Sequence, residues 1–265
     1  ECSVNLKIEN VISNDIEKEN RWGITGSNYI KDVTYKDCML NRIDAHRGVH
    51  NLTIENCIVG VKGISVVGSG DLKIINSVKL SSNSFIELRS DYGSTWNGTI
   101  YIKDCIYQSD NIQQLVSFKT SYDGDKLHYF GYDLYLPNIE IDGLSIIEGE
   151  SKSSNIYIFN NTSEKTGTEN GDMRNNYNLP ENIIIKDYEI NDNRKLELFR
   201  NKFYNDLEEL NINFSIPLKD KEEVKITNEE DKIIDTDFVL TNQTIKVTKI
   251  NKEGINTIIN VNGQE

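Results

Sequence analysis

The sequence has few of the residues that helical and zinc-binding proteins need. Alanine and leucine are sparse, which disfavours a helical protein, and the 265 residues include only three prolines. The four cysteines form no C-x-x-C pair that could combine with histidines in a structural zinc site. We therefore expect no metal site and no cofactor.

Long apolar runs and positive charge are also scarce. No stretch is apolar over the length needed to cross a bilayer, and no signal peptide is recognisable. Because the chain begins at Glu1, we expect it to be a piece of a longer protein. With 29 basic and 42 acidic residues, the net charge of −13 disfavours nucleic acid and anionic membranes as partners. Neutral sugars are compatible with this charge.

A repeated phrase is present instead, in which apolar and polar residues alternate up to an Asn or Asp. It occurs as LKIENV (6–11), VTYKDC (33–38), LTIENC (52–57), LKIINS (72–77), IYIKDC (100–105), IEIDGL (139–144) and IIIKDY (183–188). From Asp37 the turn residue recurs after 19, 20 and then 28 residues. One alternating strand for about every 20 residues is typical of a solenoid, and the unit is too short for paired helices. The sequence predicts an all-β, right-handed parallel β-helix.

The residue after each turn is small and is expected to point inward. Cys38, Cys57, Ser77 and Cys105 occupy this position in successive coils. We expect a buried stack of reduced side chains. Disulfides between neighbouring coils are the alternative, but parallel side-chain vectors seldom suit them.

The repeat also predicts how the chain is divided. Residues 1–192 are expected to form the β-helix, and residues 193–265 a small C-terminal capping or assembly region. That region would begin with a short helix, because apolar residues recur at helical intervals, and continue as β-strands. The apolar residues are Leu196, Phe199, Phe203, Leu207 and Leu210.

Ionisable residues concentrate on one strand of the second full coil. In RIDAH, Ile43 and Ala45 would point inward, so Arg42, Asp44 and His46 would share the outward face. Three such side chains on one face indicate a catalytic or binding site.

Later coils extend this face. Alignment of the coils places Ser65 and Glu87 over Asp44, and Val67 and Arg89 over His46. Glu87 would be the base of an inverting glycoside hydrolase, kept ionised by Arg89, with Asp44 or His46 as the acid.

Two alternatives stay open for these residues. The first is β-elimination from uronic acids, with Arg42 or Arg89 binding the carboxylate and His46 as base. The second is a solvated charged face in which Asp44 forms a structural ion pair with one of the arginines.

Aromatic and acidic residues of the flanking loops would complete the site. Trp22, Tyr92 and Trp96 offer flat apolar surfaces for sugar rings, and Asp91 lies beside them in the loop SDYGSTWNG. Packing within the loops is the alternative role for the aromatic residues. No metal-ligand spacing is present.

The phrases WGITGSNY (22–29), RIDAHRGV (42–49), LRSDYGSTW (88–96) and GYDLYLPNIEIDGL (131–144) carry a resemblance that covers about Arg21–Ile147. They resemble pectate-lyase-like β-helix proteins of low-GC Gram-positive bacteria and their phages, including tailspikes and preneck appendages. The Asp pairs with Gly-His-Gly of polygalacturonases and the Arg-x-Pro-x-x-Arg of pectate lyases are absent.

This resemblance implies a function on a virion surface or outside the cell. It implies a homotrimeric phage tail or appendage protein that recognises, and in one interpretation depolymerises, a surface polysaccharide or teichoic acid. A non-catalytic adhesin or spike, and a secreted bacterial polysaccharide lyase or hydrolase, are the alternatives.

Overall fold

The regular structure of the chain consists of β-strands. The computed structural model describes residues 3–19, 26–80, 83–89, 93–119, 134–149, 156–162, 177–178, 180–191, 196–200, 209–214, 224–227, 237–240, 244–248 and 256–259. Over these ranges no helix occurs, and consequently none that is long and apolar enough to span a membrane.

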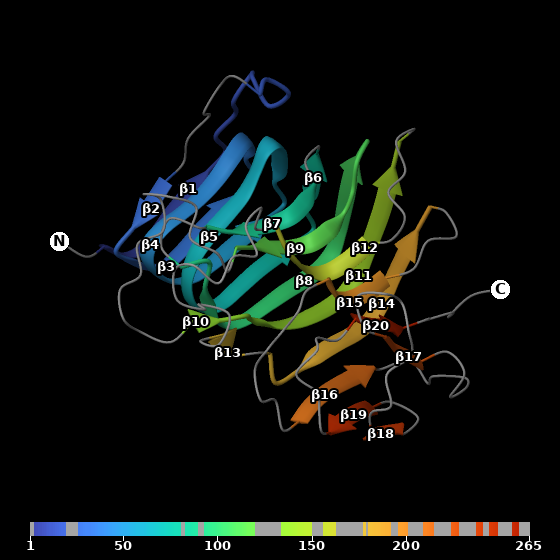
Figure 1. Ribbon diagram of the computed structural model, residues 1–265. Coiled ribbons are helices and arrows are strands. Elements are labelled where there is room, and N and C mark those ends of the chain that lie inside the picture. Colours follow the sequence, from blue (N-terminus) through green and yellow to red (C-terminus); the bar gives the residue numbers. More distant parts are fainter. Residues whose placement is uncertain are drawn as a thin grey trace, which may run out of the picture.

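The strands are numbered in chain order as in Figure 1. They are β1 (Ser3–Glu9), β2 (Gly26–Asn28), β3 (Ile30–Lys36), β4 (Met39–Glu55), β5 (Ile58–Ile75), β6 (Val78–Leu80), β7 (Ser84–Leu88), β8 (Trp96–Ser109), β9 (Gln114–Phe118), β10 (Leu134–Tyr135), β11 (Asn138–Glu148), β12 (Ile156–Asn161), β13 (Tyr177–Asn178), β14 (Ile183–Ile190), β15 (Leu196–Arg200), β16 (Glu209–Phe214), β17 (Val224–Thr227), β18 (Asp237–Leu240), β19 (Thr244–Thr248) and β20 (Asn256–Ile259).

Parallel ladders wind through these strands, and a shorter one through β6 joins Met39, Ile58, Val78 and Ile106. The two longer ladders run as follows. One runs β1–β3–β4–β5–β8–β11–β14–β16, and the other runs β2–β4–β5–β7–β9–β12–β15. Because β4 and β5 belong to both ladders, each coil bends from one sheet face to the next. Figure 1 shows the successive coils side by side, from blue at the N-terminal end to orange. The expected all-β parallel β-helix is confirmed.

Equivalent residues of the repeat stack from coil to coil as predicted. Leu52 pairs with Val33 on one side and Leu72 on the other, and Leu72 pairs with Ile100. All four are buried, so the core is a set of apolar columns along the helix axis. Fully buried aromatic residues such as Tyr35, Phe85 and Tyr107 are packed in the same interior as these aliphatic columns.

The turns that end the repeats also stack. Asp37, Asn56, Asn76 and Asp104 all have positive φ, a conformation that Asn and Asp tolerate better than most residues. Asn56 donates a side-chain hydrogen bond of 3.1 Å to Asp37. In the next coil Gly143 takes this position with φ +90°, because a Cβ there would lie 2.8 Å from Oδ1 of Asp104. These stacked turn residues, which we call the turn ladder, therefore hold neighbouring coils in register.

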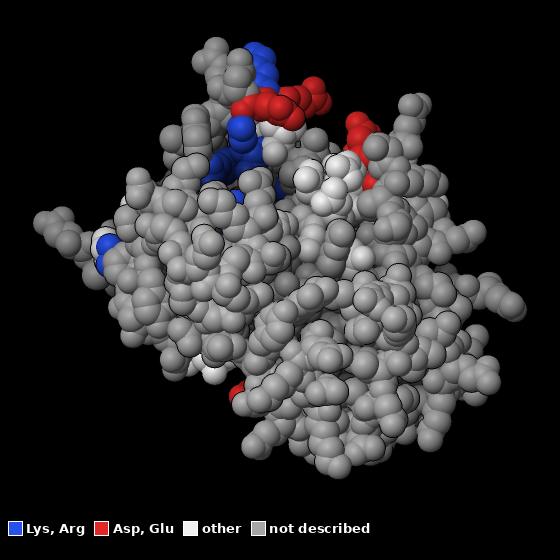
Figure 2. Space-filling view, in the orientation of Figure 1, with Lys and Arg blue, Asp and Glu red and all other residues white. Residues whose placement is uncertain are grey.

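Charged side chains cover the described outer surface in pairs of opposite sign. Lys18 lies 2.5 Å from Asp15, and Lys7 lies 2.6 Å from Glu9. Figure 2 shows described Lys and Arg side chains gathered beside Asp and Glu side chains in the upper part of the view. Such exposed pairs add little stability.

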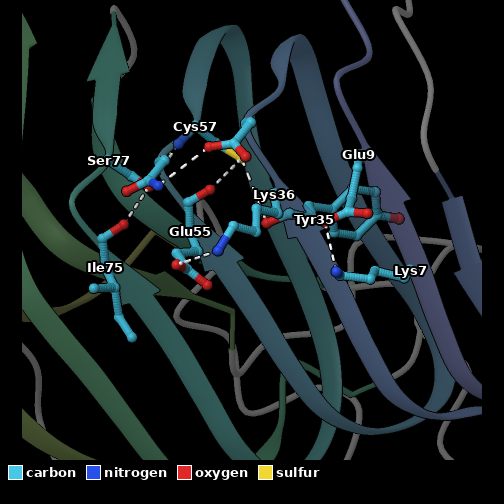
Figure 3. A network of polar contacts seen from close by, with 10 residues as sticks. Lys7, Glu9, Tyr35, Lys36, Glu55, Cys57, Ile75 and Ser77 are labelled. Atoms are coloured by element: carbon cyan, nitrogen blue, oxygen red, sulfur yellow. Dashed lines mark hydrogen bonds and ion pairs between the residues drawn. The ribbon is translucent and has the colours of Figure 1, made fainter.

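The small residues after the turns form the expected internal stack. Cys38, Cys57 and Cys105 are buried and free of disulfides, and Ser77 lies among them in the same column. Each side chain donates to the carbonyl two residues earlier, for example Cys57 to Glu55 at 3.2 Å (Figure 3). Burial raises the pKa of the Cys57 and Cys105 thiols to about 11. The reduced stack is confirmed for these residues, whereas Cys2 lies outside the described residues.

The C-terminal region differs from the expected one at its start. Leu196 lies in strand β15 and Leu210 in strand β16, so a helix over these residues is wrong where the chain is described. Both strands pair in parallel with the preceding coil, through β12 and β14. Antiparallel pairing begins with β17 to β20. The division at residue 192 stays a prediction.

A lysine side chain lies inside the β-helix. Lys79 of β6 pairs with Val59 and Tyr107 in an inward column and is almost fully buried. Its ammonium donates to the carbonyls of Leu80 at 2.7 Å and Gly60 at 3.4 Å. Burial lowers the pKa of Lys79 to about 7, because the charged form loses its hydration.

Lys79 therefore makes stability depend on pH. In the unfolded chain its pKa is about 10.4, so between about pH 7 and pH 10 the unfolded state holds the extra proton. The free energy of unfolding should rise with pH across this window and be flat, with respect to this group, below it. We expect Lys79→Met to remove the slope and to stabilise the fold by about 1–4 kcal/mol. Urea titrations at several pH values measure both effects.

A matched control is Lys73→Met, because Lys73 is exposed and pairs with Asp71 at 3.1 Å. It should change the free energy of unfolding by about 0.5 kcal/mol or less and leave the slope in place. A slope that persists in Lys79→Met would show that another group causes it.

Candidate functional site

A line of polar residues crosses the coils at the position predicted for the site. Asp44 of β4 pairs with Ser65 of β5, Ser65 pairs with Glu87 of β7, and the line continues to Ser117 and Asn160. We call these five residues the polar file. The predicted alignment of Asp44, Ser65 and Glu87 is confirmed. Sequence reasoning missed Ser117 and Asn160, because the segment between β7 and β8 lengthens the coil and interrupts the repeat spacing.

Exposure differs sharply along the polar file. Ser65 is 1% exposed, whereas Glu87 is exposed. The hydroxyl of Ser65 donates to Oε2 of Glu87 at 3.1 Å. One carboxylate oxygen of Glu87 is thereby oriented by a buried group, while the side chain as a whole faces solvent. This combination suits a carboxylate that acts on an external substrate.

Asp44 is held by arginine from two coils. Nη1 of Arg89 lies 2.7 Å from both carboxylate oxygens of Asp44, and Nη2 of Arg42 lies 3.3 Å from Oδ2. The side chains of Asp44 and Arg89 are each only 13% exposed. Arg89 was expected to keep Glu87 ionised, but its observed ion pair is with Asp44. The side chain of Arg89 is long enough to reach back across two coils, which a strand alignment does not show.

Arg42 is also placed differently from the expectation. It was predicted to point outward and bind substrate, yet it is 8% exposed and its guanidinium contacts Asp44. The structure therefore shows the ion pair that the alternative interpretation predicted. Arg42, Asp44 and Arg89 form a nearly buried charged cluster beside the exposed Glu87.

His46 lies on the same strand but out of the predicted column. Ala45 pairs with Val66 and Val49 with Gly68, so residues 46–48 of β4 stand against the single residue Val67 of β5. This bulge moves His46 out of strict register with Val67. Its side chain is half-buried.

The predictions for the sugar-binding residues differ in their outcome. Trp96 is fully buried, and its indole Nε1 donates to the carbonyl of Gly70 at 2.9 Å. The prediction that Trp96 stacks on a sugar is wrong, because strand β8 directs this ring into the core. Trp22, Asp91 and Tyr92 lie outside the described residues. The described part of the chain contains no cluster of metal-ligating side chains.

The fold and this face define the class of the protein as a parallel β-helix with an exposed carboxylate beside a buried ion-pair cluster. No protein-family model matches the chain. It is 32% identical over 94 residues to a capsule KL64-specific depolymerase of Klebsiella phage P510. That match covers 31% of this chain and 9% of the relative, so the chain spans a small part of its length.

Among solved structures, the tailspike gp61 of Pseudomonas phage phi297 aligns with a TM-score of 0.40 and 10% identity. The alignment covers 96% of this chain and 48% of the tailspike. The depolymerase is a phage protein, in agreement with that part of the expected resemblance. Its source is a Klebsiella phage, so the expected low-GC Gram-positive group is not supported.

Proposed function

We propose that the chain is a piece of a phage tailspike-type β-helix that binds a bacterial surface polysaccharide on the face around Glu87 and cleaves it. The observation that carries the proposal is the contrast within the polar file. Glu87 is exposed and oriented by Ser65, whereas Asp44 is locked by Arg89. The similarity to a capsule-specific depolymerase supports a capsular polysaccharide as the ligand.

Glu87 is the proposed base of an inverting hydrolysis. It would take a proton from water as the water oxygen attacks the anomeric carbon, and His46 would donate a proton to the leaving oxygen. Because both oxygens of Asp44 accept from Arg89, its role is to position that guanidinium.

Hydrolysis has two competitors at this site. If the glycan contains uronic acids, Arg89 would bind the carboxylate and His46 would start a β-elimination. The second competitor is a face that binds glycan without cutting it, and the engagement of both Arg42 and Arg89 by Asp44 favours it. A homotrimer on the virion surface is the proposed assembly, with teichoic acid as the alternative ligand.

A binding and cleavage assay tests this proposal. The chain is incubated with purified bacterial capsular polysaccharides, including the Klebsiella KL64 type, and with wall teichoic acid. New reducing ends without ultraviolet absorbance indicate hydrolysis, and absorbance from a new double bond indicates elimination. Binding without product supports the non-catalytic alternative. Absence of both binding and product across the set would overturn the glycan function.

A further inference from the structure

An exposed aromatic residue lies at the corner before β3. Tyr29 is 48% exposed, and no other aromatic residue of the described ranges is as open to solvent. Its φ is +53°, in the left-handed region that bulky residues rarely adopt. Backbone strain of this kind persists only where the surroundings impose it, and it concentrates at ligand sites.

The neighbouring coil imposes this conformation and fixes the ring. The backbone N–H of Tyr29 donates to the carbonyl of Arg47 at 2.8 Å. At Gly48, φ is +61° and an added Cβ would lie 3.0 Å from Cδ1 of Tyr29, so the ring packs against bare backbone. The guanidinium of Arg47 lies over the ring, 5.7 Å from its centroid. An exposed ring is thus held in one orientation beside a polar, hydrogen-bonding group.

The corner between β2 and β3 adjoins strand β4, which carries Asp44 and His46. Ser27 pairs with Ala45 and Asn28 with Arg47, which places Tyr29 next to the bulge at residues 46–48. Asp44 and Arg47 lie on β4 about 10 Å apart along the strand. A glycan that crosses the coils from Glu87 to Asp44 and continues along β4 toward Arg47 would therefore reach Tyr29.

We propose that Tyr29 and Arg47 form a sugar subsite in which one face of a pyranose ring stacks on Tyr29 and the Arg47 guanidinium donates to the ring substituents. This inference rests on the proposed function, because it assigns a subsite to the same glycan. An aromatic face supplies apolar contact for the C–H groups of a sugar, and its immobilisation lowers the entropy lost on binding. The residue has no proton-transfer role and is a binding residue only.

The structure offers a variant that removes the ring without harming the fold. Tyr29→Gly keeps the positive φ at lower strain, so its melting temperature should equal or exceed that of the wild type. Tyr29→Phe keeps the ring, and Gly48→Ala displaces it. The matched control is Tyr101→Ala, because the ammonium of Lys73 lies 5.8 Å from the centroid of that ring, on a different strand.

The test uses the 265-residue chain carrying Glu87→Gln, so that binding is measured without cleavage. Its dissociation constants are determined for the capsular polysaccharide that the wild type binds best among a panel that includes the KL64 type. Tyr29→Gly should weaken binding about tenfold, Gly48→Ala should also weaken it, and Tyr29→Phe should retain most of it. Tyr101→Ala should bind as the parent does.

The two proposals fail in different ways. If the chain binds none of the polysaccharides, the glycan function and the subsite are both overturned. If binding is intact in Tyr29→Gly while its fold is retained, the subsite alone is overturned. Equal losses of affinity in Tyr29→Gly and Tyr101→Ala would indicate a general effect of removing a surface aromatic ring. That result would also overturn the subsite.

Discussion

Replacing Glu87 with glutamine is expected to lower the rate of product release from the bound polysaccharide by about 10²–10⁴-fold. The amide keeps the size of the side chain but cannot accept the proton of the attacking water. Because Glu87 is exposed and its carboxylate accepts a hydrogen bond from Ser65 that an amide oxygen can also accept, the melting temperature should change little. Initial rates with excess polysaccharide, together with thermal unfolding, measure the two quantities.

The control for this variant is Glu55→Gln. Glu55 also forms a pair across adjacent coils, with Lys36 at 2.7 Å, but it lies on the strand segment beside the cysteine stack (Figure 3). It should leave product release unchanged. Wild-type rates in Glu87→Gln would remove Glu87 as the base and, with it, the proposed hydrolytic mechanism.

Replacing Asp44 with alanine is expected to destabilise the fold by about 3–5 kcal/mol. The change leaves the guanidiniums of Arg89 and Arg42 in a nearly buried position without the carboxylate that contacts both. Loss of a partner in such a cluster costs more than loss of an exposed pair, since the remaining charges stay poorly hydrated. Urea unfolding of the purified variant gives the difference in free energy.

An exposed pair provides the comparison. Asp71 lies 3.1 Å from Lys73, and both side chains are well exposed, so Asp71→Ala should cost about 1 kcal/mol or less. If Asp44→Ala is as stable as the wild type yet inactive, Asp44 takes part in the chemistry and its assignment as a positioning residue is wrong.

Sequence periodicity predicted the features that depend on the backbone repeat. Turn residues such as Asp37 and Asn56 mark the same corner of successive coils, so aligning them predicted the observed pairing of the repeat phrases in β3, β4 and β5 and the reduced cysteine stack. The alignment was one residue out at the preceding coil, where Gly26 rather than Thr25 pairs with Asp44. The same alignment placed Asp44, Ser65 and Glu87 in one line. Each of these results follows from one strand geometry applied repeatedly.

Features that depend on side-chain reach or local irregularity were not predictable in this way. The pairing of Arg89 with Asp44 spans two coils, and the bulge before Val49 displaces His46 from its column. Trp96 follows a loop, so the repeat could not assign its face, and the structure buries it. Leu196 and Leu210 fit a helical spacing by coincidence, because they lie in two separate strands, β15 and β16.

Because of the turn ladder, coils of different length keep their core residues aligned. Ile102 pairs with Ile74 and Ile141, and Ile141 pairs with Ile185, although the chain between these partners differs greatly in length. Lengthening the segment between two paired strands costs little free energy. The segments between strands can therefore change in length or sequence while the apolar columns keep their pairing.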